Sequence, residues 1–202
     1  MKLIFASNNK HKIEELKAFS GIESDSYRIE IVSLKEAGID IDIPEPHDSL
    51  EENASEKAWI IHRLTGNDCF SEDTGLEIEA LNGEPGVKSA RYAGETRSFN
   101  DNIEKVLNKL SSETNRKARF RAVISLIIDG HETQFEGVCN GKIIHSPRGT
   151  DGFGYDPIFV PDGSKLSFAE MSIAEKNLFN HRIKAAAKLV AFLQNMKANS
   201  TN

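Results

Sequence analysis

Acidic side chains are concentrated in the middle of the chain, and their oxygens are of the type that Mg²⁺ takes in proteins together with substrate phosphates. They are Glu45, Glu51, Glu52, Glu56, Glu72, Asp73 and Glu77. Glu51 and Glu56 fit better on a solvated helix face. Glu72 and Asp73 differ, because adjacent carboxylates that end an apolar strand and precede Thr-Gly are placed like catalytic groups at a strand terminus. We therefore expect that one of them ligates metal while a carboxylate positions or deprotonates water.

A second polar segment, Ser7-Asn8-Asn9-Lys10-His11-Lys12, precedes a predicted helix near the start of the chain. Unpaired backbone N–H groups and the positive end of the helix dipole attract phosphate at such a place. Ser7 and Asn9 can donate hydrogen bonds, and Lys12 adds charge. Because this is not a Walker sequence, a plain capped helix with solvated lysines explains the pattern equally well.

Several basic residues lie on predicted helices. Lys57 follows Asn53 by one helical turn, so the two side chains can face the same way. Lys176 and Arg182 lie near the start of the last helical region, although exposed basic residues are in most cases only solvated. His181 lies next to Arg182 in a predicted helix, yet a surface histidine is the simpler interpretation.

Phe153 lies between two glycines in the glycine-rich loop of residues 150–157. The pattern leaves two interpretations open. The ring either anchors the loop in the core or forms an aromatic plate for a base.

Alternating strand and helix signals fill the first half of the chain, and strand signals dominate later. The predicted strands are 3–6, 28–34, 68–71, 76–80, 120–128, 131–139 and 142–144. Helices are predicted after Ser7, from Ser49 to Gly66, from Ser98 and over 172–196. The dipeptides Asp129-Gly130 and Asn140-Gly141 predict the turns of a three-stranded antiparallel meander.

These elements predict an α/β fold in which helices flank a mixed twisted sheet. We expect a single domain over residues 1–202, elongated into two lobes with a central substrate cleft.

Composition limits the function classes. The chain of 202 residues has 31 Asp and Glu against 25 Lys and Arg, a net charge of −6 that argues against nucleic acid polymers and anionic membranes as partners. Cys69 and Cys139 lie in apolar runs and are expected to be reduced core thiols. No apolar run suits a signal peptide or a membrane span, so we expect a cytoplasmic protein.

Taken in order, the motifs resemble those of the inosine/xanthosine triphosphate pyrophosphatase family over nearly the whole chain. The matching segments are Ser7 to Glu15, Ile43-Pro44-Glu45, Glu52-Asn53-Ala54 with Lys57, Glu72 to Leu76, Pro85 to Tyr92, Gly149 to Pro157, Ala169-Glu170, Glu175-Lys176 and Asn180-His181-Arg182. Three positions depart from the family pattern: Glu72 replaces Asp, Asp151 replaces Gly and Asn180 replaces Ser.

The resemblance implies a Mg²⁺-dependent, homodimeric enzyme that hydrolyses deaminated purine nucleoside triphosphates to the monophosphate and pyrophosphate. It implies that Ser7 to Lys12, Lys57 and Lys176 hold the triphosphate. Glu45 and Asp73 would hold Mg²⁺, and Asp73 would also activate water.

The same resemblance assigns the other substrate contacts. Thr74 would touch substrate, and so would the segment Phe153-Gly154-Tyr155-Asp156, in which Phe153 stacks on the base. Asp156, His181 and Arg182 would read the base edge. A keto oxygen at purine position 6 accepts hydrogen bonds from Arg182, whereas the amino group of adenine would face it donor to donor.

Two alternatives remain. A related pyrophosphatase of the same fold could act on modified pyrimidine or methylated nucleotides, which the segments at Phe153 and His181 argue against. A nucleotide-binding sensor without hydrolysis is the other, and the presence of both Glu45 and Asp73 argues against it.

Overall fold

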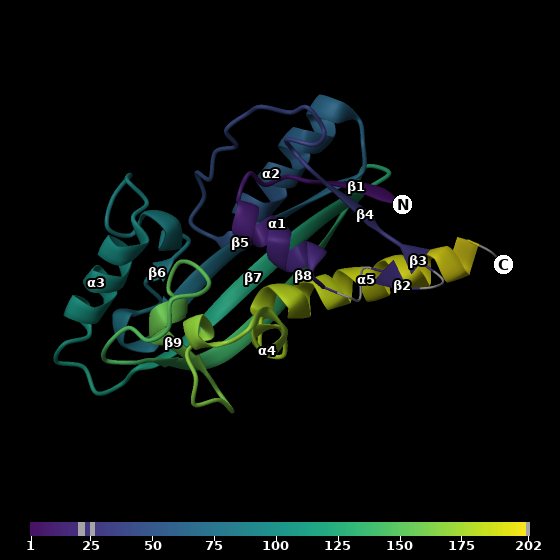
Figure 1. Ribbon diagram of the computed structural model, residues 1–202. Coiled ribbons are helices and arrows are strands. Elements are labelled where there is room, and N and C mark those ends of the chain that lie inside the picture. Colours follow the sequence, from purple (N-terminus) through teal and green to yellow (C-terminus); the bar gives the residue numbers. More distant parts are fainter. Residues whose placement is uncertain (20–22, 25–26, 201–202) are drawn as a thin grey trace. The chain divides into compact units, whose positions relative to one another are not determined.

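The computed structural model describes residues 1–19, 23–24 and 27–200, and the chain forms two compact units (Figure 1). Unit 1 comprises Met1–Asp73, Ala122–Gly137 and Arg182–Asn202. Unit 2 comprises Thr74–Arg121 and Val138–His181. Three of the four boundaries between the units fall within long strands: β5 (Cys69–Ile78), β7 (Lys117–Ile128) and β8 (His131–Ile143). The fourth lies between His181 and Arg182.

The sheet contains seven strands in the order β4-β1-β5-β7-β8-β9, with β6 (Pro85–Gly86) paired to β5. β1 (Lys2–Phe5) pairs in parallel with both β4 (Glu30–Ser33) and β5. β8 pairs antiparallel with β9 (Phe159–Pro161). A separate two-stranded sheet pairs β2 (Glu23–Ser24) with β3 (Tyr27–Arg28) in antiparallel orientation. The sheet is therefore mixed, as predicted.

Unit 1 buries apolar side chains on both faces of its strands, because successive strand residues point to opposite faces. Leu3 and Phe5 share a core cluster with residues of α1 (Lys10–Lys17) and α5 (His181–Ser200). Ile4 and Ala6 share another with α2 (Leu50–Thr65). Helices thus cover both faces of these strands.

Unit 2 has its own core around Phe120 of β7 and Phe159 of β9, whose ring centroids lie 4.7 Å apart. α3 (Phe99–Lys109) contributes Ile103 and Val106. The remaining elements of this unit are the 3₁₀ turns η2 (Glu79–Leu81), η3 (Ser89–Arg91), η4 (Asp156–Ile158) and η5 (Phe168–Glu170) and the helix α4 (Ile173–Asn177).

The prediction that Glu72 and Asp73 lie at a strand-to-loop junction is wrong. β5 runs without interruption through both residues. Carboxylates can lie inside a buried strand when cations pair with them, and the partners in this case come from distant segments that the local pattern cannot reveal.

The predicted turn at Asn140-Gly141 is also wrong, whereas Asp129-Gly130 does form a tight turn between β7 and β8 with positive φ at both residues. β8 continues through Gly141, which pairs with Pro161 of β9. A Cβ atom at Gly141 would overlap the main chain of Val160 and the ring of Phe159. The glycine permits this close approach of β9. The third strand beside β8 is therefore β9, whereas residues 142 and 143, predicted to form that strand, belong to β8.

The predicted helical region 172–196 is two helices, α4 and α5, separated by Leu178, Phe179 and Asn180. The capping box expected at Ser172 and Glu175 is present and starts α4. Among the described residues, no helix has the length and apolar character needed to cross a membrane. The elongated two-lobed shape and the central cleft remain predictions.

Candidate functional site

The predicted site residues fall into two groups, one in each unit. Unit 1 contains Ser7 to Lys12, Glu45, Lys57, Asp73 and Arg182. Unit 2 contains Thr74, Phe153 to Asp156, Lys176 and His181. That both groups line one cleft remains a prediction.

Lys57 is the centre of the group in unit 1. Its Nζ lies 2.8 Å from Asp73 Oδ1, 2.7 Å from Glu45 Oε1 and 3.1 Å from the carbonyl oxygen of Glu72. Glu45 reaches Lys57 from the loop before α2. A single ammonium therefore brings together the two carboxylates that were predicted to bind metal.

The charges of this cluster depend on one another. Burial disfavours the ammonium of Lys57, but the carboxylates of Asp73 and Glu45 outweigh burial and raise its pKa. Burial raises the pKa of Asp73, and the ammonium groups of Lys57 and Lys12 only partly oppose that shift. Lys57 is thus favoured as a cation, whereas the pKa of Asp73 stays above its ordinary value despite the nearby cations.

The donor set fits a hard cation. Asp73 Oδ2 is buried and has no hydrogen-bond partner within the described residues. Its neighbour Oδ1 and Glu45 Oε1 are already oriented toward a positive charge, the ammonium of Lys57. In the described part of the chain, no group of three or more His, Cys, Asp or Glu side chains is arranged to hold a metal. A Mg²⁺ ion at Glu45 and Asp73 would therefore need further oxygen ligands from substrate phosphates and water.

Arg182 lies at the start of α5 and is the largest side chain that the fold buries completely. Its Nε lies 2.9 Å from Glu72 Oε2, and its Nη1 contacts Glu15 Oε2. Burial disfavours the charge of Arg182, but the carboxylates of Glu72 and Glu15 outweigh burial and raise its pKa. The guanidinium is thus engaged with two carboxylates, and its predicted contact with the base remains a prediction.

Lys12 is a second basic residue that approaches Glu72. Its Nζ is 3.3 Å from the carbonyl oxygen of Glu72 and 3.5 Å from Oε2 of the same residue. Burial lowers the pKa of Lys12, and the carboxylate of Glu72 partly opposes that shift. Glu72 of β5 is thus buried and contacts two basic residues, Lys12 of α1 and Arg182 of α5.

The segment Ser7 to Lys12 begins α1 as predicted, with Asn9 as the N-cap. Asn9 Oδ1 accepts hydrogen bonds from the backbone N–H groups of His11 at 3.0 Å and Lys12 at 3.3 Å. Asn8 donates to the carbonyl oxygen of Ile41 at 3.0 Å. Lys10 and His11 are exposed. The cap therefore satisfies two of the helix N–H groups that were predicted to receive phosphate.

In unit 2, Asp156 organises the glycine-rich loop. Its Oδ2 accepts a hydrogen bond from the backbone N–H of Phe153 at 2.9 Å and from Lys176 Nζ at 2.6 Å. Lys176 Nζ lies 5.2 Å from the centroid of the Phe153 ring. Gly152 has φ +77° and leaves room for the Asp156 carboxylate, which a Cβ atom would overlap. A half-buried ring, an ammonium and a carboxylate thus lie together.

The other predicted residues of unit 2 lie near this loop in the sequence or in the core. Tyr155 is buried and donates to the carbonyl oxygen of Ser89 at 2.9 Å, and burial raises its pKa. Gly154 has φ +62°. The buried ring of His181 stacks on Phe120, with centroids 4.8 Å apart. Thr74 follows Asp73 in β5, so its side chain points to the opposite face of the strand.

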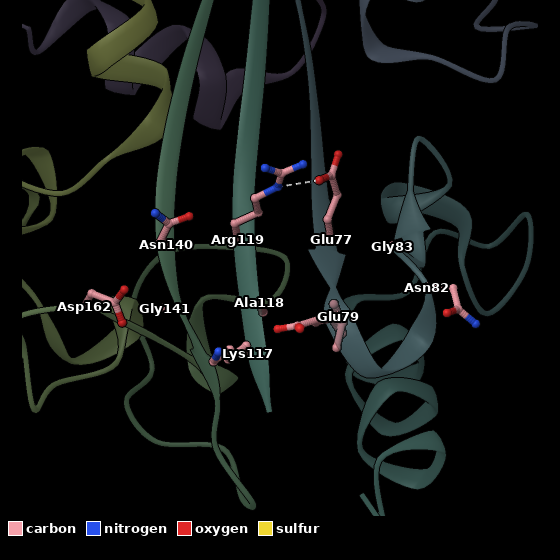
Figure 2. Close-up of a pocket in the computed structure, with 11 residues that line it drawn as sticks. Glu77, Glu79, Asn82, Gly83, Lys117, Ala118, Arg119, Asn140, Gly141 and Asp162 are labelled. Atoms are coloured by element: carbon pink, nitrogen blue, oxygen red, sulfur yellow. Dashed lines mark hydrogen bonds and ion pairs between the residues drawn. The ribbon is translucent and has the colours of Figure 1, made fainter. Parts of the chain in front are cut away.

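A cavity of about 670 Å³ in unit 2 is lined by strand ends of β5, β7 and β8 (Figure 2). In Figure 2, Arg119 of β7 and Glu77 of the neighbouring strand β5 face each other. Arg119 Nε lies 2.6 Å from Glu77 Oε2. None of the predicted site residues lines this cavity. Its size therefore does not identify it as the substrate site.

Three residues near the predicted site received no role from the sequence: Glu15 and Asn53 were named only within motifs or beside a site residue, and Phe99 was not named. Glu15 is buried against Arg182, Asn53 is completely buried on α2, and Phe99 lies 6.4 Å from Phe153 between ring centroids. A signal existed for Glu15, which follows Lys12 by three residues and so shares its helix face. No local pattern marked Phe99.

Comparisons with known proteins agree with the motifs. A model of the Ham1 family matches residues 3–192. The dITP/XTP pyrophosphatase of Flavobacterium psychrophilum is 48% identical over 195 residues, which cover 96% of this chain and 100% of that protein. The dITP/XTP pyrophosphatase of Porphyromonas gingivalis is 50% identical and covers 95% of this chain and 97% of its own.

Solved structures show the same fold. A HAM1 protein from Coxiella burnetii matches with a TM-score of 0.87 and 34% identity, over 96% of this chain and 99% of that chain. This match confirms the predicted mixed α/β fold with helices beside a mixed sheet.

The pairing of Arg182 leads to a stability prediction. Arg182→Met should lower the free energy of unfolding by about 3–5 kcal/mol, because it leaves the carboxylates of Glu72 and Glu15 buried without their cation. Arg119→Met is the matched control, since Arg119 is half exposed and its ion pair with Glu77 should contribute at most about 1 kcal/mol. Urea unfolding of both variants measures the difference, and equal losses would contradict the account of Arg182.

Proposed function

Because this chain belongs to the Ham1 family, we propose that it hydrolyses deaminated purine nucleoside triphosphates, such as ITP, dITP and XTP, to the nucleoside monophosphate and pyrophosphate. The relatives from Flavobacterium and Porphyromonas named above are dITP/XTP pyrophosphatases, and each aligns over nearly the whole chain. The observation that carries the proposal is the contact of one ammonium, Lys57 Nζ, with both Glu45 and Asp73.

Lys57 and Lys12 serve the triphosphate. Each is largely withdrawn from water, and each lies close to the carbonyl oxygen of Glu72, at 3.1 Å and 3.3 Å. A phosphate oxygen that approaches this point meets two ammonium groups in a region of low dielectric, where their attraction is stronger than in water.

Glu45 and Asp73 are the residues that would hold Mg²⁺. When bound, the ion neutralises charge on the phosphates and polarises the phosphorus under attack. The buried and unpartnered Asp73 Oδ2 supports this assignment, since an orphaned carboxylate oxygen is costly without a cation or a donor.

Asp73 orients and deprotonates the attacking water. Its second oxygen, Oδ1, is fixed by Lys57 at 2.8 Å, so Oδ2 keeps one orientation. The water attacks the α-phosphorus, the bond from that phosphorus to the bridging oxygen breaks, and pyrophosphate leaves.

The base lies against Phe153. Lys176 was predicted to hold the triphosphate, but its ammonium lies beside the Phe153 ring and on Asp156, which favours a contact with the base. An ammonium donates hydrogen bonds and accepts none, so it suits the position-6 oxygen of inosine or xanthosine and opposes the amino group of adenine. We assign Lys176 as the donor and keep Asp156, His181 and Arg182 as further base-reading candidates.

We propose a homodimer, as the resemblance implies, acting in the cytoplasm. Buried thiols support a reducing compartment: burial raises the pKa of Cys69 to about 12, which keeps this thiol protonated and unreactive.

Product analysis tests the reaction. Incubation of the protein with ITP and Mg²⁺ should give inosine monophosphate and pyrophosphate, and Asp73→Asn should lower kcat by about 10²–10⁴-fold with an unchanged circular dichroism spectrum. The amide keeps the shape of the side chain but cannot take a proton from water. Asp68→Asn is the control, because Asp68 lies outside the cluster and accepts a hydrogen bond from the backbone of Asp129.

Other products would favour a different function. Orthophosphate and inosine diphosphate would contradict the cleavage site. Tight binding of ITP without any product would favour the sensor, and faster turnover of modified pyrimidine or methylated nucleotides in the same screen would favour the related pyrophosphatase.

Base selection has its own test. Phe153→Ala should lower kcat/KM for ITP and ATP alike, because stacking does not distinguish the position-6 group. Lys176→Met should lower kcat/KM for ITP more than for ATP and so narrow their ratio about tenfold or more, since one unpaired donor costs about 1–3 kcal/mol. Lys165→Met, at an exposed lysine of the same unit, should leave the ratio unchanged. If Lys176→Met lowers kcat/KM for ITP and ATP by the same factor, Lys176 binds the triphosphate and not the base.

A further inference from the structure

Glu45 lies in a segment that has little regular structure to hold it. Residues 39–49 form neither helix nor strand. Pro44 and Pro46 flank Glu45 and have no backbone N–H to donate. The position of the Glu45 carboxylate therefore depends on contacts that reach the loop from outside.

Asn53 of α2 provides such a contact. Its Oδ1 accepts a hydrogen bond from the backbone N–H of His47 at 2.9 Å, and its Nδ2 donates to the carbonyl oxygen of His47 at 3.1 Å. The Asn53 side chain is completely buried. One amide thus satisfies both main-chain groups of a residue two positions after Glu45, as a neighbouring strand would.

The same helix holds the carboxylate. Lys57 follows Asn53 by one helical turn, and its Nζ lies 2.7 Å from Glu45 Oε1. α2 therefore fixes the loop at two points, the main chain of His47 and the side chain of Glu45. Because Lys57 also contacts Asp73 Oδ1 at 2.8 Å, these contacts set the place of Glu45 relative to Asp73.

We infer that Asn53 is a positioning residue of the metal site: by clamping the main chain of His47, it presents Glu45 to the ion that Glu45 shares with Asp73. The inference rests on the proposed function. Residues that orient a metal ligand without touching the metal change metal affinity by about 10–100-fold when they are replaced.

The chain contains a matched control. Asn102 of α3 is also buried and also lies four residues after a serine N-cap, Ser98, as Asn53 lies four after Ser49. Its side chain accepts from the backbone N–H of Ala93 at 2.6 Å and donates to the carbonyl oxygen of Ala90 at 3.1 Å. Asn102 thus does the same structural task for a loop of unit 2 that carries none of the proposed metal ligands.

The experiment compares Asn53→Ala, Asn102→Ala and His47→Ala with the unmodified protein. Two quantities are measured: the Mg²⁺ concentration at half-maximal turnover of ITP, and Mn²⁺ binding in the presence of pyrophosphate, followed by the electron paramagnetic resonance of free Mn²⁺. Asn53→Ala should raise the Mg²⁺ midpoint about tenfold or more and weaken Mn²⁺ binding by a similar factor, while kcat recovers at high Mg²⁺. Asn102→Ala should lower thermal stability without moving either metal constant.

His47→Ala should change nothing, because the clamp uses only the main chain of His47. If Asn53→Ala does not fold, Asn53→Ser carries the same test with a smaller shift. Unchanged metal constants in the Asn53 variant, or equal shifts in Asn102→Ala, would overturn the inference. Absence of Mn²⁺ binding by the unmodified protein would overturn it as well. If the unmodified protein releases no pyrophosphate from ITP, the proposed function fails; if it does and only the Asn53 shift is missing, the inference alone fails.

Discussion

A charge that is removed from water must meet an opposite charge, and this requirement organises unit 1. Glu72 and Asp73 are each almost completely buried within β5, and so are Lys57 on α2 and Arg182 on α5. The cost of burying any one of them alone is several kcal/mol, so the strand and the two helices must stay in register with one another. Because desolvation offsets much of their attraction, these ion pairs need not add net stability, but the loss of one partner is costly.

That constraint also separates tasks between neighbouring carboxylates. Glu72 has both oxygens directed to Arg182, at 2.9 Å and 3.4 Å, and its role is to anchor α5 and Lys12 to the sheet. Asp73 has one oxygen held by Lys57 and the other without a partner among the described residues. The structure therefore favours Asp73 over Glu72 as the group that serves metal and water. Unit 2 repeats the principle with Lys176 and Asp156, whose pair fixes the loop of Phe153.

The sequence allowed correct predictions where the cause is local. Ser49 and Gly66 bound α2 as expected, because capping by a serine side chain and a left-handed glycine act within one turn. Predictions failed where the cause is distant. Asn140-Gly141 is a strong turn signal, yet Gly141 lies within β8 and pairs with Pro161 of β9. The glycine makes room for β9, which lies twenty residues later in the sequence. Carboxylates inside β5 were unexpected, because the cation that neutralises Glu72 lies 110 residues away.

The candidate site divides in the same way. Motif resemblance assigned roles to Glu45, Lys57 and Asp73, and the structure adds the contacts that join them. The resemblance did not assign roles to Glu15 or Asn53, because the role of a buried glutamate or asparagine is defined by its partners in the folded structure.

The most direct test of the account is hydrolysis of ITP in water enriched in ¹⁸O, with the products analysed by mass spectrometry. If Asp73 directs water to the α-phosphorus, the label enters inosine monophosphate and the pyrophosphate remains unlabelled. Label in the pyrophosphate would place the attack on the β-phosphorus and would contradict the assigned geometry of the site.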